Sequence, residues 1–240
     1  MPLLKDFFMK YKAVVFDLFT TLTSLRHLKD APGRFSNQIL GISSEEWSDA
    51  LFNRSRERLT GLITDPVDII RDIAWKIDPS ISEDILNSCA KERRLRFNYC
   101  LKHPPAGVVE SLLAIREGGY KLGLVSNVDV IEVEGWKGSD LSTCFDTAVF
   151  SCYEGYMKPD PEIFGLCSTR LDVAPQDCLY VGDGGNEELI ASAKAGMTAV
   201  LTSQFLQDTA PEKVMEREKT VNHHIRNLDE ILPLLGQLEG

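Results

Sequence analysis

This chain has few positively charged residues relative to its negatively charged ones. Its 240 residues include 26 lysines and arginines against 36 aspartates and glutamates, so the formal net charge is −10. Nucleic acids and anionic membranes are bound by basic surfaces, so we expect neither as a partner. Apolar runs are also short. Because a membrane-spanning helix needs about 18 or more apolar residues in sequence, we expect no membrane span.

Paired cysteines and targeting signals are missing as well. The six cysteines form no Cys-x-x-Cys motif and have no histidine cluster beside them, which favours small buried apolar side chains over disulfides. The first 16 residues are interrupted by charges, and no signal-peptide cleavage pattern follows them. These features predict a cytoplasmic protein in a reducing environment. The cysteines are Cys89, Cys100, Cys144, Cys152, Cys167 and Cys178.

The chain is organised around residues 13–23. Ala13 to Phe16 are apolar and include two valines, as in a buried strand, and the carboxylate of Asp17 follows directly. An acid that follows a buried parallel strand lies at the carboxyl edge of the sheet, where open α/β sheets bind ligands. The alternative for this stretch alone is a surface turn in which Asp17 and Thr21 cap local backbone groups.

Two different patterns follow this strand. Up to residue 105 the sequence predicts three helices without a convincing strand, beginning near Ser43, Asp65 and Ser82, of which the first runs to about residue 59. From residue 107 onward, helices alternate with strands, which predicts a parallel sheet with right-handed crossovers. We therefore predict an α/β protein with a helical bundle inserted after its first strand. The later strands are expected at 121–125, 147–150, 178–181 and 198–201.

Polar side chains follow three of the predicted strands. Asp17, Ser126-Asn127 and Asp183 each stand at a carboxyl end, so a parallel sheet brings them to one edge. Lys158 lies between them in sequence, in a proline-rich segment. Each residue alone has an ordinary explanation as part of a turn or a solvated surface. Their joint occurrence at one edge predicts a functional site.

In this order, the four segments resemble the motifs of the haloacid dehalogenase-like (HAD) hydrolase superfamily. The resemblance spans about residues 12–201. It implies a Rossmann-like HAD core, residues 1–23 and 106–240, with a small α-helical cap domain, residues 24–105. The segments are Phe16-Asp17-Leu18-Phe19-Thr20-Thr21-Leu22, Leu124-Val125-Ser126-Asn127, Lys158-Pro159-Asp160-Pro161 and Val181-Gly182-Asp183-Gly184-Gly185-Asn186-Glu187-Glu188.

The resemblance also implies roles for individual residues. Asp17 would form a covalent aspartyl intermediate that water then hydrolyses, and Lys158 would neutralise charge on the nucleophile and on the substrate. Glu188, or its neighbour Glu187, would orient a metal-bound water. The implied catalytic residues are Asp17, Thr21 and Lys158, and the implied substrate-binding residues are Ser126, Asn127 and Lys158. The implied Mg²⁺ ligands are Asp17, the backbone carbonyl of Phe19 and Asp183, and Glu188 would reach the metal only through another ligand.

Two positions depart from the family pattern. Phe19 stands where HAD phosphatases usually carry a general-acid Asp, and an aromatic residue there resembles the haloacid dehalogenases, whose halide leaves without a proton. Asp183 points the other way, because dehalogenases of this fold work without metal and lack this acid. Thr20 replaces the usual Gly, which affects the geometry of the turn. Three carboxylates facing one lysine would also favour a bound cation.

The favoured hypothesis is a Mg²⁺-dependent phosphatase-type hydrolase that acts on a small phosphorylated metabolite. It would be slow on alkyl phosphates, because Phe19 cannot donate a proton. One alternative is a metal-independent 2-haloacid dehalogenase in which Arg26 or Arg34 holds the substrate carboxylate. A second is a HAD protein that binds a phosphorylated ligand or partner without catalysis. We expect a small anionic substrate and a monomer or homodimer.

Overall fold

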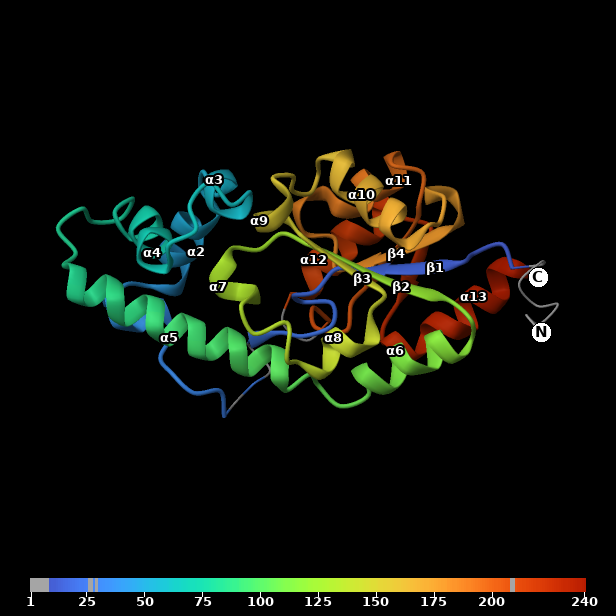
Figure 1. The fold of residues 1–240 in the computed structure, drawn as a ribbon, viewed down its shortest axis with the longest axis horizontal. Helices are drawn as coiled ribbons and strands as arrows, with labels where there is room; N and C mark the ends of the chain where they lie inside the picture. The colour runs from blue at the N-terminus through green and yellow to red at the C-terminus, as the bar shows by residue number, and fades with distance from the viewer. Residues whose placement is uncertain (1–8, 26–27, 29, 208–209) are drawn as a thin grey trace.

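A six-stranded, fully parallel sheet forms the centre of the protein (Figure 1). The computed structural model describes residues 9–25, 28, 30–207 and 210–240. The strand order is β3-β2-β1-β4-β5-β6, so the chain winds outward from β1 in both directions, which confirms the predicted Rossmann-like α/β fold. The strands are β1 (Ala13–Phe16), β2 (Lys121–Ser126), β3 (Thr147–Phe150), β4 (Cys178–Gly182), β5 (Thr198–Thr202) and β6 (His223–Ile225).

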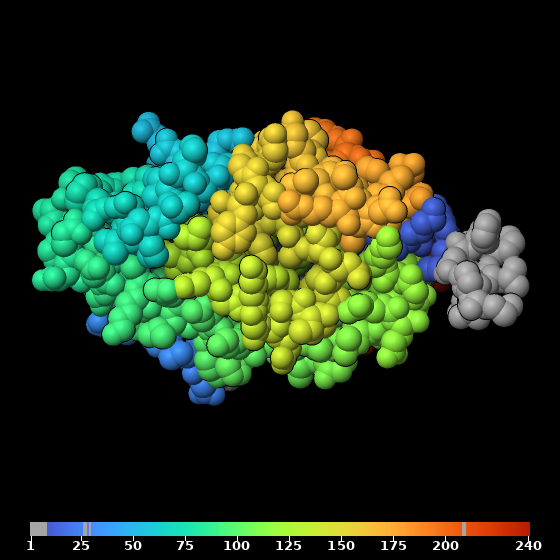
Figure 2. Space-filling view, in the orientation of Figure 1, coloured from blue at the N-terminus to red at the C-terminus, as the bar shows by residue number. Residues whose placement is uncertain are grey.

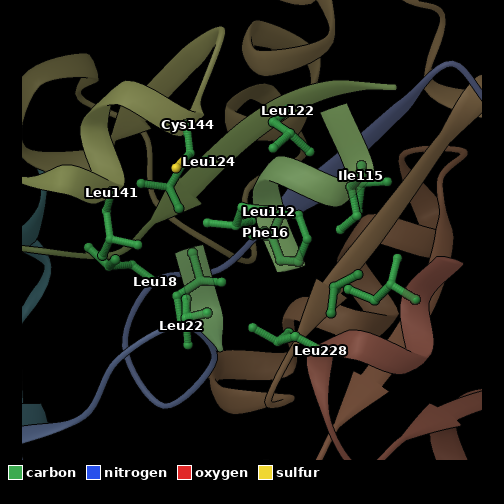
Figure 3. Close-up of a cluster of buried hydrophobic side chains, with 14 of the residues drawn as sticks. Phe16, Leu18, Leu22, Leu112, Ile115, Leu122, Leu124, Leu141, Cys144 and Leu228 are labelled. Carbon is green, nitrogen blue, oxygen red and sulfur yellow. The ribbon is translucent and has the colours of Figure 1, made fainter. Parts of the chain in front are cut away.

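Helices cover both faces of the sheet. Val14 and Phe16 of β1 enter one apolar cluster, and Ala13 and Val15 enter the other, because successive side chains of a strand point to opposite faces. Figure 3 shows Phe16 within the first of these clusters. The first cluster is closed by α6 (Val108–Glu117), α8 (Asp140–Cys144) and α13 (Ile231–Glu239). The second is closed by α10 (Pro161–Leu171), α11 (Glu188–Lys194) and α12 (Pro211–Arg217). The sheet is therefore the middle of three layers.

Between β1 and β2 the chain builds a separate group of helices, at the left of Figure 1. They enclose an apolar cluster of their own, which includes Ile69, Ile73 and Leu86. This arrangement fits a cap, while the exact limits of residues 24–105 stay a prediction. The helices are α1 (Ser36–Leu40), α2 (Ser44–Phe52), α3 (Arg56–Leu59), α4 (Pro66–Ala74) and α5 (Glu83–Lys102).

The first predicted helix of this group is shorter than expected. It ends at Phe52, and α3 begins only at Arg56, whereas the sequence pattern predicts one helix to about residue 59. Arg54 adopts a left-handed backbone conformation, with φ of 47°, through which a right-handed helix cannot continue. The single-turn α1 was not predicted, because five residues are too few to show a helical period.

Ion pairs join the helical insertion to the core. Arg58 of α3 and Arg93 of α5 lie 3.6 and 3.7 Å from the buried carboxylate of Asp129, and Arg93 also pairs with Glu132. Asp129 caps α7 (Val130–Val133), the helix that follows β2. In Figure 2 the region of α2 and α3 lies directly against the region of α9 (Ser151–Glu154). The insertion is thus held against the carboxyl edge of the sheet.

Short 3₁₀ turns complete the described chain. They are Pro175–Asp177, Gly185–Glu187, Glu218–Thr220 and Leu228–Glu230. All six cysteines are buried and unpaired, as predicted. Within the described ranges, no helix has the length and apolar character needed to cross a bilayer.

Candidate active site

Asp17 stands directly after β1, at the edge where the chain reverses its winding direction. Its backbone N–H donates to the carbonyl of Val181 at 2.9 Å, which fixes it beside the end of β4. The hydroxyl of Thr21 donates to Asp17 Oδ2 at 3.1 Å. Thr20 adopts φ of 68° in the intervening turn, so this β-branched residue accepts the left-handed conformation that a glycine would adopt without strain.

Lys158 is held from two sides. The side chain of Asn127 accepts from the Lys158 backbone N–H at 2.7 Å and donates to its carbonyl at 2.8 Å, so the loop after β2 positions the lysine. The Lys158 ammonium then donates to Asp17 Oδ1 at 2.5 Å and to Glu188. Only 2% of the Lys158 residue is exposed. The predicted surface alternative is therefore wrong for this lysine.

Glu188 is the acid of the fourth motif that reaches the site. Its Oε1 accepts from the backbone N–H of Gly184 at 2.9 Å, and its Oε2 accepts from the hydroxyl of Tyr180 at 2.8 Å. Glu187 is exposed. Gly182 is required beside this carboxylate, because a Cβ atom there would lie 2.2 Å from Glu188 Oε1.

Asp183 has a cationic partner that the sequence motifs do not reveal. Nη1 of Arg217, the last residue of α12, donates to the Asp183 carbonyl at 2.6 Å and to its Oδ2 at 2.8 Å. The expectation that three carboxylates face a single lysine is therefore wrong. Two cations, Lys158 and Arg217, face three carboxylates, which leaves a formal charge of −1 when all are ionised.

Burial and mutual repulsion change the acidity of these groups. Burial raises the pKa of Asp17, with Lys158 opposing this effect and Asp183 adding to it. Burial likewise raises the pKa of Glu188 to about 8, against the attraction of Lys158. Burial alone would lower the pKa of Lys158, but the carboxylates of Asp17 and Glu188 outweigh it and raise that pKa. Perturbed groups of this kind, gathered in one place, are typical of functional sites.

The acidic side chains suit a hard divalent cation. Carboxylate oxygens of Asp17, Asp183 and Glu188 all lie within 4.8 Å of one another. Oxygen ligands from one or two carboxylates are the usual protein contribution to a Mg²⁺ site. Because the cluster also has an excess of negative charge, the residues present fit Mg²⁺.

Of the other predicted residues, some lie at this edge of the sheet and others do not. Ser126 is buried at the end of β2, the strand beside β1, and so shares the edge with Asp17. Phe19 packs edge to face on Phe97 of α5, with ring centroids 5.2 Å apart, so the position two residues after Asp17 faces the insertion. Arg34 is exposed, and its backbone N–H donates to Glu92. Arg26 lies outside the described residues.

Sequence reasoning missed Tyr180 and Arg217. Tyr180 lies inside β4 and reads as one more buried strand residue, although its hydroxyl contacts both Lys158, at 3.2 Å, and Glu188. Burial raises the pKa of Tyr180 well above its usual range. Arg217 lies 34 residues beyond the acid that it contacts, at the end of an unremarkable helix. A polar tip on a fully buried strand was the one available signal, and it applies only to Tyr180.

Known proteins resemble this chain in sequence and in fold. The chain is 29% identical over 139 residues to a glyceraldehyde 3-phosphate phosphatase of Methanothermobacter thermautotrophicus, a match that covers 56% of this chain and 61% of that protein, less than two thirds of its length. It is 27% identical to the pyrophosphatase PpaX of Bacillus mycoides, over 71% of this chain and 77% of that protein.

Solved structures and a family model extend these likenesses over most of the chain. A dehalogenase with an intermediate complex superposes with a TM-score of 0.65 at 19% identity, covering 94% of this chain and 97% of that one. A HAD family enzyme of Bacteroides thetaiotaomicron in complex with magnesium and inorganic phosphate gives a TM-score of 0.58 at 19% identity, over 80% and 94%. The model for haloacid dehalogenase-like hydrolases matches residues 11–196. The chain therefore belongs to the haloacid dehalogenase-like hydrolases.

Proposed function

We propose that the chain is a Mg²⁺-dependent phosphatase that acts on a small phosphorylated metabolite through Asp17. The observation that carries this proposal is the buried contact of Lys158 with both Asp17 and Glu188, next to Asp183. An acid cluster that retains Asp183 favours a metal-assisted phosphoryl transfer over metal-free chemistry. The names of the phosphatase and pyrophosphatase relatives support the same class of substrate.

The first step would be attack of an Asp17 carboxylate oxygen on phosphorus as the P–O bond to the leaving group breaks. The leaving group would depart as an alkoxide, aryloxide or carboxylate, and an alkoxide or aryloxide would take its proton from water. The Lys158 ammonium, already on Asp17 Oδ1, would stabilise negative charge that shifts to the phosphoryl oxygens. Ser126 would donate a hydrogen bond to the same group. Water would then hydrolyse the aspartyl phosphate and regenerate Asp17. Bound Mg²⁺, held by Asp17, Asp183 and the Phe19 carbonyl, would neutralise phosphoryl charge.

Thr21 and Glu188 would act through other groups. The Thr21 hydroxyl holds Asp17 Oδ2, so the orientation of the nucleophile is set before substrate binds. Glu188 links the Lys158 ammonium to the backbone of Gly184, and so ties the lysine to the loop that carries Asp183. The Asn127 side chain supports the Lys158 backbone from the opposite side.

Phe19 would restrict the range of leaving groups. A phenyl ring cannot protonate a departing alkoxide, and general acid catalysis is typically worth about 10²–10⁴-fold in rate. Aryl and acyl phosphates, whose leaving groups need no proton, would therefore be better substrates than alkyl phosphates. The same aromatic residue keeps the 2-haloacid dehalogenase alternative open for testing.

The test compares two reactions. Release of phosphate from an aryl phosphate and of halide from an L-2-haloacid are each measured with and without Mg²⁺, with Asp17→Asn as the blank. We expect Mg²⁺-dependent phosphate release that disappears in Asp17→Asn. Metal-independent halide release would overturn the proposal in favour of the dehalogenase, and Mg²⁺ binding without either reaction would favour a non-catalytic ligand-binding protein.

A further inference from the structure

A small cavity lies between α5 and the first helices of the insertion. It measures about 210 Å³ and is lined by apolar and charged side chains, including Phe35, Arg93, Arg96, Phe97 and the carboxylate of Glu132. The lining is neither purely apolar nor open surface, so the cavity has the mixed character of a ligand site.

The two arginines in this cavity differ in their partners. Arg93 is paired with Glu132 and stacks over Phe97, with its guanidinium carbon 4.6 Å from the ring centroid. Arg96 donates from Nη1 to the Gly33 carbonyl at 2.8 Å and lies 3.5 Å over the Phe35 ring. Among the described residues, no carboxylate lies within 4 Å of the Arg96 guanidinium.

Arg96 therefore carries a buried charge that has no carboxylate partner among the described residues. The residue is only 6% exposed, and its Nε is buried without a hydrogen-bond partner, as is that of Arg93. A buried charge costs free energy unless an opposite charge accompanies it. Burial also lowers the pKa of Arg96, which is the direction expected where a counter-charge is missing.

The cavity is adjacent to the candidate active site. Phe97 lines it and also packs on Phe19, two residues after the nucleophile. One turn further along α5, Cys100 contacts the hydroxyl of Thr23, at the end of the same loop. One face of α5 thus carries the cavity at one end and contacts with the loop of Asp17 at the other.

We propose that this cavity binds the end of the substrate remote from the phosphate, and that this end is a carboxylate paired with Arg96. The inference rests on the proposed phosphatase function and names its substrate class: phosphate monoesters that carry a carboxylate on a small flat or apolar body. One unpaired guanidinium matches one negative charge, because Arg93 already has Glu132 as its partner. Arginine also presents a planar fork that suits a carboxylate.

The test uses two aryl phosphates of the same shape. 4-Carboxyphenyl phosphate carries the charge, and 4-carbamoylphenyl phosphate replaces it with a neutral amide. The amide is the more electron-withdrawing group, so chemistry alone would favour the amide ester. We expect wild-type kcat/KM to favour the carboxylate ester by about 10- to 100-fold, the range typical of a hydrogen-bonded charge.

Variants assign this preference to Arg96. In Arg96→Met the preference should fall to within about threefold, and Arg96→Lys should keep part of it, because the charge remains and the fork is lost. Lys91→Met removes an exposed positive charge from the same helix and should leave the preference unchanged. Calorimetric binding of 4-hydroxybenzoate to the wild-type protein gives a readout that needs neither turnover nor a folded variant.

The outcomes separate this inference from the proposed function. If both esters are hydrolysed at similar rates and 4-hydroxybenzoate does not bind, the cavity assignment is wrong while the phosphatase function stands. If neither ester is hydrolysed, the proposed function fails, and binding of 4-hydroxybenzoate lost in Arg96→Met still decides the cavity. Preference for 1,4-phenylene bisphosphate over the carboxylate ester would overturn the carboxylate in favour of a second phosphate.

Discussion

Replacing Arg217 with methionine is expected to strengthen Mg²⁺ binding. Its guanidinium donates twice to Asp183, to a carboxylate oxygen and to the carbonyl, so a cation that takes this carboxylate must compete with it. Charge-assisted hydrogen bonds are worth about 1.5–3 kcal/mol. The side chains of Arg217 and Asp183 are 21% and 14% exposed, and we discount the pair for solvent screening to about 1–2 kcal/mol. The Mg²⁺ dissociation constant should therefore fall about 5- to 30-fold.

Calorimetric titration of Mg²⁺ into the variant and the wild-type protein measures this change without any need for turnover. Lys213→Met is the matched control, because Lys213 is exposed on the same helix and its replacement removes the same charge. The control should bind Mg²⁺ within about twofold of wild type, since exposed charges act weakly at a distance. An Arg217→Met protein that binds Mg²⁺ equally or less tightly would refute competition, and would mean that Arg217 holds Asp183 in place for the cation.

Three further predictions concern Phe19, the lysine and the α7 ion pairs. Phe19→Asp should accelerate alkyl phosphate hydrolysis by about 10²-fold or more relative to Phe19→Asn, because the asparagine side chain cannot act as a general acid. Equal alkyl-to-aryl rate ratios in the two variants would contradict the leaving-group argument. Lys158→Met should lower the free energy of unfolding, measured in urea at pH 7.5, by about 3–5 kcal/mol, because Asp17 and Glu188 lose their shared buried cation. A loss below about 1 kcal/mol would count against that pairing. Burial, followed by the Asp129 carboxylate, raises the pKa of Glu132 to about 7. The folded state therefore holds this proton more tightly than the unfolded chain between pH 5 and 8, and wild-type stability falls as pH rises. Because glutamine does not titrate, the free energy of unfolding of Glu132→Gln should rise relative to wild type by up to about 3 kcal/mol across that interval, as measured by urea denaturation. A difference that does not change with pH would show that Glu132 stays ionised.

The fold could be predicted because its signals are local. The strands of the sheet core are short, apolar and bounded by turns, so the segments predicted at 147–150 and 198–201 agree with β3 and β5 to within one residue. Asp17, Ser126 and Asp183 could be assigned to one edge, since parallel strands present their carboxyl ends together. Lys158 lies between these segments in sequence but follows no predicted strand, and the structure explains its position by two backbone hydrogen bonds with the Asn127 side chain.

The remaining features depend on contacts between distant parts of the chain. Nothing near Arg217 indicates that it reaches Asp183, and no periodicity in α5 separates the buried Arg96 from the exposed Arg94. Consecutive charged residues such as Lys91 to Arg94 usually lie on a solvated face, yet Arg93 among them is buried. Pairing and burial of charged side chains follow from tertiary packing, which a single sequence does not report.

The six buried thiols can report local unfolding of the protein. A cysteine reacts with a thiol reagent only when it meets solvent, so labelling rates measure how often each region unfolds. Cys89 belongs to the apolar cluster of the insertion, whereas Cys167 and Cys178 belong to the cluster on one face of the sheet. If the insertion opens independently, Cys89 will be labelled first, and substrate or Mg²⁺ will protect it. Mass spectrometry of the labelled peptides would then resolve domain motion in the native chain, without any engineered probe.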